Sequence, residues 1–117
     1  MSKIRLERVN SEMMKNISEI LHNGLRDAEL TAMTGVTYVK VTPDLKHAKV
    51  GISIYGDDEV KRKNFEAVAA SKGFIKKELA LRMGHMHALP ELHFEMDTGL
   101  DYSEHINKIL KELNKDD

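Results

Sequence analysis

Residues 69–83, AASKGFIKKELALRM, contain the side chains whose types and spacing best suit a chemical role. The pattern predicts helix on both sides of Gly73, although glycine inside a helix costs about 1 kcal/mol relative to alanine. Two explanations stay open. Gly73 allows two helices to pack closely, or it lets the helix axis turn and exposes amide groups beside Lys72. Amides, helix dipole and cation together favour a phosphate.

Lys76 and Lys77 follow within the same stretch. The apolar positions of this segment recur at helical spacing as Ile75, Leu79 and Met83. Both lysines lie off that apolar stripe, so we expect them to face solvent. A solvated charge pair is the ordinary explanation for such residues, and contact with a polyanion is the functional one.

Further cations could widen a basic surface, and their distribution along the chain is uneven. They are Arg5, Arg8 and Lys15 in the first predicted helix and Lys40, Lys46 and Lys49 around a predicted hairpin. The formal net charge is −1; residues 91–117 hold eight acids and three lysines, −5, which leaves +4 on residues 1–90. A basic body can face a polyanion, although two ordinary solvated surfaces explain the charges equally well.

Enzymatic and metal-binding roles find little support in the residue pattern. Cysteine is absent, which excludes thiolate chemistry and is typical of a reducing compartment. His85, His87 and His93 suggest a metal site, but the third lies in a different pattern from the first two. The acidic run 57–59 is better explained as the cap of a helix than as a catalytic cluster. We expect no cofactor, no metal and no small-molecule substrate.

Three Phe, three Tyr and no Trp provide few aromatic platforms for exposed bases. This composition disfavours the sheet-based stacking mode of RNA recognition. Any nucleic-acid contact is therefore expected to use backbone amides and cations. The first residues alternate charged with apolar side chains, and no run reaches membrane-spanning length, so we expect a cytoplasmic protein.

The periodicity of the chain predicts the order α, β, β, α, α, β, α. The predicted elements are a helix over about 4–23, strands over 36–42 and 47–55, helices on either side of Gly73 within 58–83, a strand over 91–97 and a terminal helix after a capping box at 101–104. Residues 24–35 are interpreted as a connection. With 117 residues and no repeat or linker, we expect one domain, 1–117, in which residues 101–117 form a partly frayed helix.

A helix, glycine, helix arrangement after two hairpin strands resembles the type II K-homology topology, in which a glycine-containing connection meets nucleic-acid backbone. More closely, the chain is similar to the ribosome-binding factor A family over nearly its whole length. The segments that carry this resemblance are RLERVNSEMMKNISEIL, VTPDLKHAKVGISIYG, KGFIKKELALRM, LPELHFEMD and DYSEHINKILKEL. Their order and spacing together make the resemblance specific.

The resemblance implies an α+β fold: a single αββααβ domain with a kinked helix pair on a three-stranded mixed sheet, plus a C-terminal helix. In this family a helical kink of the form Ala, any residue, Gly replaces the usual glycine loop. The matching triplet here is Ser71, Lys72 and Gly73, with serine in place of alanine. Relatives usually place arginines just ahead of Pro-Glu-Leu, where this chain has His85 and His87.

The resemblance also implies a function. The expected protein is a non-catalytic monomer that binds free small (30S) ribosomal subunits and assists late maturation and processing of 16S rRNA near its 5′ terminal helix. The expected RNA-binding residues are Ser71, Lys72, Gly73, Lys76, Lys77, Arg82, Arg5 and Arg8. The alternative is a protein-interaction or dimerisation module of the same α+β architecture without RNA binding, which would use the open sheet face or the terminal helix.

Overall fold

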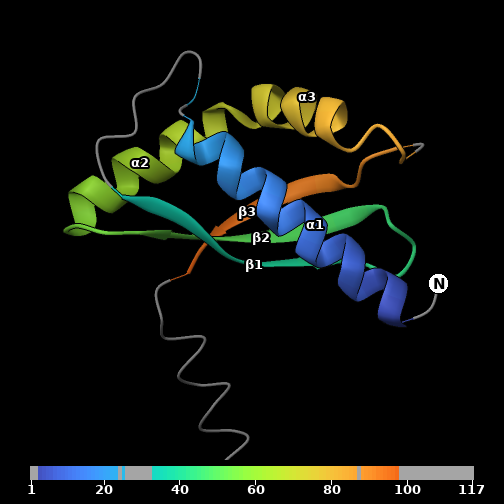
Figure 1. Cartoon of the computed structure of the whole chain (residues 1–117). Helices are drawn as coiled ribbons and strands as arrows, with labels where there is room; N and C mark the ends of the chain where they lie inside the picture. Colours follow the sequence, from blue (N-terminus) through green and yellow to red (C-terminus); the bar gives the residue numbers. More distant parts are fainter. Residues whose placement is uncertain (1–2, 24, 26–32, 87, 98–117) are drawn as a thin grey trace, which may run out of the picture.

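The computed structural model describes residues 3–23, 25, 33–86 and 88–97. Within them the chain forms six elements (Figure 1). These are α1 (Lys3–His22), β1 (Thr34–Val41), β2 (His47–Ile54), α2 (Asp58–Ala70), α3 (Lys72–Arg82) and β3 (Glu91–Met96). The predicted order is confirmed up to β3. The predicted terminal helix, His87 and most of the 24–35 connection lie outside the described residues.

The three strands form one mixed sheet with β2 in the centre. β1 pairs with β2 antiparallel through a tight hairpin, and β3 pairs with β2 in parallel. The hairpin turn is held by the Asp44 carboxylate, which accepts hydrogen bonds from the Thr42 hydroxyl at 2.6 Å and the Lys46 N–H at 3.0 Å. These two bonds lower the pKa of Asp44.

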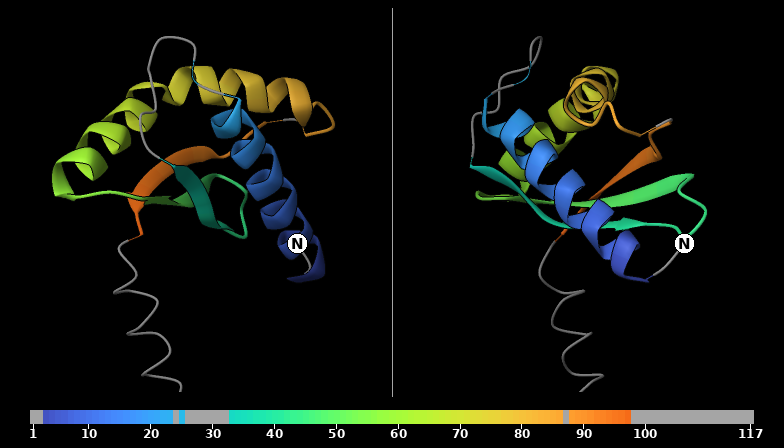
Figure 2. Two further views of the ribbon diagram at one scale, coloured as in Figure 1. Left: turned by 60° about the vertical axis from the view of Figure 1, so that its left-hand side comes forward. Right: turned by 45° about the vertical axis from the view of Figure 1, so that its right-hand side comes forward.

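All three helices cover the same face of the sheet (Figures 1 and 2). Alternate residues of β2, from Ala48 to Ile54, are buried on that face, as the period-two pattern predicts. They join Met13 and Ile17 of α1 and apolar residues of α3 in one core. Burial of each large apolar side chain contributes about 1.5–3 kcal/mol. The opposite face of the sheet carries no described helix.

The position of α1 is fixed by a hydrogen bond as well as by packing. The Asn10 side-chain oxygen accepts from the Val41 N–H at 2.8 Å, where β1 ends. Asp57 caps the N-terminus of α2: its carboxylate accepts from the Val60 N–H at 2.9 Å, as expected for a residue in the acidic run. No helix among the described residues has both the length and the apolar character needed to cross a bilayer.

Candidate nucleic-acid interface

The helix pair is interrupted at one residue, Ser71. Its backbone angles are φ −94° and ψ 12°, and its N–H lies 3.2 Å from the Ala67 carbonyl and 3.1 Å from the Val68 carbonyl. Its own carbonyl accepts from the Ile75 N–H at 2.9 Å, within the first turn of α3. The Ser71 hydroxyl makes no capping hydrogen bond. The two helices meet at an angle here (Figure 2, left), so the predicted kink is present.

Gly73 does not occupy the bend itself. It is the second residue of α3 and lies exposed on the surface. A Cβ built on it would meet no described atom within 4 Å. Gly56 is the only glycine among the described residues with a positive φ, so Gly73 needs no left-handed conformation. The close-packing explanation is therefore wrong. Because Gly73 has no side chain, the backbone of the first turn of α3 is uncovered at this position.

The first cations of α3 share one carboxylate. Lys72 Nζ lies 2.6 Å from Glu91 Oε1, and Lys76 Nζ lies 3.8 Å from Glu91 Oε2. The hydrogen bond from Lys72 lowers the pKa of Glu91, followed by the charges of Lys72 and Lys76. Both lysines are half-buried, so the expectation that Lys76 faces solvent freely is only partly correct. The carboxylate from β3 offsets part of their charge.

The remaining α3 cations differ from each other. Lys77 is exposed and makes no ion pair within the described part of the chain. Arg82 donates to Glu19 of α1 at 2.5 Å and connects the end of α3 to α1. Of the two, Lys77 is therefore the more available to an external anion.

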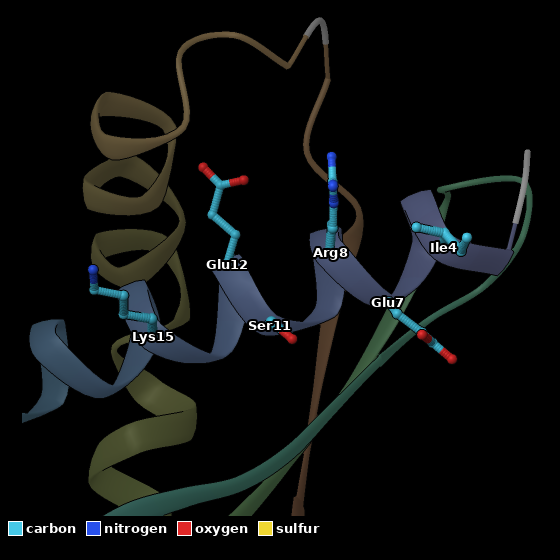
Figure 3. A pocket seen from close by; sticks show the side chains of 6 residues that line it. All are labelled: Ile4, Glu7, Arg8, Ser11, Glu12 and Lys15. Carbon is cyan, nitrogen blue, oxygen red and sulfur yellow. The ribbon is translucent and has the colours of Figure 1, made fainter.

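Two of the three predicted α1 cations, Arg8 and Lys15, line a shallow pocket of about 550 Å³ on the outer side of this helix. Its lining residues are Ile4, Glu7, Arg8, Ser11, Glu12 and Lys15. Arg8 and Glu12 point toward the segment between α3 and β3 (Figure 3). Oε2 of Glu12 lies 3.5 Å from Nε2 of His85, which belongs to that segment. Arg5 is exposed and already takes part in an interaction within the chain. Acidic side chains interrupt this surface, so it is less basic than the arginines alone suggest.

Two features could not be predicted from the sequence pattern. The alternation of polar and apolar residues in 91–96 indicates only that Glu91 faces outward from its strand. Its contact with α3 depends on how β3 packs beside that helix. The face of the sheet that no described helix covers is called the open face. On it His47 and His93 lie side by side, with 3.0 Å between Nδ1 of His47 and Nε2 of His93. Their outward positions in two strands are visible in the alternating pattern, whereas the pairing of those strands is not. Among the described residues, no three His, Cys, Asp or Glu side chains are placed to hold a metal ion.

The order αββααβ, the mixed sheet and the helix pair broken at Ser71 define a protein with a type II K-homology-like α+β fold. The family model of ribosome-binding factor A matches residues 5–110, and the chain belongs to that family.

Known proteins agree with this assignment. A ribosome-binding factor A of Clostridium botulinum strain Hall is 39% identical over 117 residues, covering 100% of this chain and 97% of the relative. The crystal structure of the Thermus thermophilus factor superposes with a TM-score of 0.65 at 20% identity, covering 78% of this chain and 93% of that one. A homology model of the Thermus thermophilus factor, fitted into a cryo-EM map of a 30S complex, gives a TM-score of 0.59 at 21% identity, with coverages of 74% and 88%.

Proposed function

We propose that this protein binds the free small ribosomal subunit and assists the late maturation and processing of 16S rRNA, near its 5′ terminal helix. The match of the family model over residues 5–110 carries this proposal. The fitted Thermus thermophilus model in a 30S complex supports the choice of subunit. In this proposal the protein acts in the cytoplasm as a monomeric single domain, and it binds RNA without catalysing a reaction.

The contact we propose is the junction of α2 and α3. The exposed backbone at Gly73 lets a phosphate approach the first turn of α3, where the positive end of the helix dipole favours an anion. Lys77 lies exposed on the same helix, and Lys72 adjoins Gly73 in the chain. These groups recognise backbone charge and position, and they carry no base-reading capacity of their own.

Glu91 gives this contact a specific electrostatic property. In the free protein its carboxylate holds Lys72 at 2.6 Å, which fixes the ammonium group close to the junction. An rRNA phosphate that binds there replaces a carboxylate that is half exposed to water, and exposed ion pairs of this kind contribute little to stability. Exchange of Glu91 for phosphate is therefore energetically accessible.

Co-sedimentation with isolated 30S subunits across a salt series tests the proposal. The variant Lys72→Gln with Lys77→Gln should bind about tenfold more weakly at moderate salt, with a shallower dependence of log K on log salt, because it releases fewer counterions. The matched control is Lys61→Gln with Lys63→Gln, which removes two positive charges from α2 and should bind like the natural chain.

Two results would contradict this account. Equal loss in both double variants would indicate a general charge effect without a defined contact at the junction. Binding that does not weaken as salt rises would favour the alternative, an interaction module that docks on a protein through an apolar interface.

A further inference from the structure

Three rings from three different strands lie on the open face of the sheet. The Tyr38 ring of β1 lies across Gly51 of β2, where a Cβ would collide with it, and its hydroxyl donates to the Glu95 carboxylate of β3. The ring is therefore held across the central strand. On the same face, His47 of β2 and His93 of β3 are hydrogen-bonded to each other, with ring centroids 5.1 Å apart and planes tilted by 43°.

Two lysines lie opposite each other on the same face. Lys40 of β1 pairs directly opposite Lys49 of β2, and Lys49 pairs opposite His93. Neither lysine forms an ion pair with a carboxylate among the described residues, and Lys40 Nζ lies 5.1 Å from the Tyr38 ring centroid. Like charges directly opposite each other destabilise a sheet. A bound polyanion would remove this repulsion.

The two imidazoles, His47 and His93, and the two lysines, Lys40 and Lys49, line a hollow of about 640 Å³ beside the hairpin turn. Its wall also includes Pro43 and Glu95, and the Glu95 carboxylate accepts the hydrogen bond of the Tyr38 hydroxyl. This volume lies within the range of pockets that hold small organic groups. Two imidazole rings and two ammonium groups are the kinds of group on which a nucleobase stacks and to which its phosphate binds.

We propose that the open sheet face is a second RNA-binding surface, which takes an unpaired strand with its bases over His47 and His93 and its phosphates at Lys40 and Lys49. Unpaired bases stack on aromatic rings, histidine included, while lysines bind the backbone. Paired bases in an RNA helix do not present their faces in this way. The inference rests on the proposed function in one respect, namely that the partner is RNA.

This surface lies opposite the helix layer, so the protein would contact two RNA segments at once. The low number of Phe, Tyr and Trp residues disfavours base stacking. That number does not include the imidazole rings of histidine, which also stack on bases. The pairing of β2 with β3 brings two imidazoles together on the face that also carries Tyr38, and this could not be read from the residue counts.

Titration of the isotopically labelled full chain with a uridine octamer, followed by amide NMR shifts, tests the proposal. The octamer should shift amides of residues 38–40, 47–50 and 92–94, and a short RNA duplex should not. His47→Ala with His93→Ala should weaken octamer binding about tenfold through lost stacking. Lys40→Gln with Lys49→Gln should reduce the salt slope by about 1.4, which is about 0.7 for each lost phosphate contact on a single strand. Lys61→Gln with Lys63→Gln serves as the charge control.

The lysine-to-glutamine variant should fold, because it removes a repulsive pair, and its circular dichroism and melting curve check this. Octamer shifts confined to residues 71–77 would overturn the inference and leave the proposed function intact. Shifts on the open face alone would support the inference and contradict the junction as the contact. Open-face shifts that are unchanged in both double variants, or equally strong with the duplex, would also overturn it.

Discussion

Gly73 and Gly51 have opposite surroundings. A Cβ at Gly51 would overlap the Tyr38 ring, whereas a Cβ at Gly73 would meet no described atom. The sequence marks both as glycines inside regular elements, where the residue weakens a helix or a strand. Which one serves packing and which one leaves a surface bare depends on side chains that arrive from other elements. The sequence therefore predicted the break near Gly73 but not its cause.

Replacement of Gly73 by alanine separates stability from binding. Because the site is open and its conformation is helical, Gly73→Ala should leave the free energy of unfolding unchanged or raise it by about 0.5–1 kcal/mol. The added methyl group should still weaken 30S binding, since it covers the surface that a phosphate would approach. Chemical denaturation and co-sedimentation measure the two effects.

The contrasting variant is Gly51→Ala, which should lower the free energy of unfolding by about 1–3 kcal/mol because the Tyr38 ring must move. A destabilised Gly73→Ala with a stable Gly51→Ala would contradict this assignment of the two residues. So would a stable Gly73→Ala that binds 30S subunits with unchanged affinity.

At the scale of elements, the contact between α3 and β3 sets the charge of the candidate interface. Glu91 begins β3 and reaches both Lys72 and Lys76 on α3. Period-two alternation in residues 91–96 puts Glu91 on the outward side of its strand, and helical periodicity predicted an outer position for Lys76. Neither pattern contains the distance between a strand and the helix before it. For this reason the individual elements could be predicted well, whereas the neutralising contact could not.

Glu91→Gln should strengthen 30S binding about two- to fivefold at neutral pH, because the removed carboxylate repels phosphate and competes for Lys72.

The pH dependence of stability has a definite sign. The pKa of Glu91 is lowered in the folded chain, so the contribution of its ion pair is present above the ordinary glutamate pKa and is lost as pH falls below about 4.

Thermal melting of both chains across pH checks the second part, and co-sedimentation checks the first. Any stability difference between the natural chain and Glu91→Gln should be seen at neutral pH and should diminish in acid. Weaker 30S binding by Glu91→Gln would show that the carboxylate assists the contact, and this would contradict the competition with phosphate.

At the scale of the molecule, the three described helices lie on one face of the sheet, and no described helix covers the other face. The predicted layer arrangement is confirmed for the described elements, because apolar alternation and helical stripes specify which side of each element is buried. The arrangement gives the protein two chemically different surfaces. The helix junction offers bare backbone and the exposed Lys77, and the open sheet face offers aromatic rings and the lysines Lys40 and Lys49.

The central claim is that the α2–α3 junction lies against rRNA, and directed hydroxyl-radical cleavage tests it most directly. The chain contains no cysteine, so a single introduced cysteine can carry an iron chelate at one chosen position. Ala70→Cys places the chelate beside the junction on an exposed residue, and Asp58→Cys places it at the far end of α2. In 30S complexes, we expect cuts in 16S rRNA from position 70 and none above background from position 58. Cuts from position 58 alone, with both labelled chains bound to the subunit, would contradict the claim.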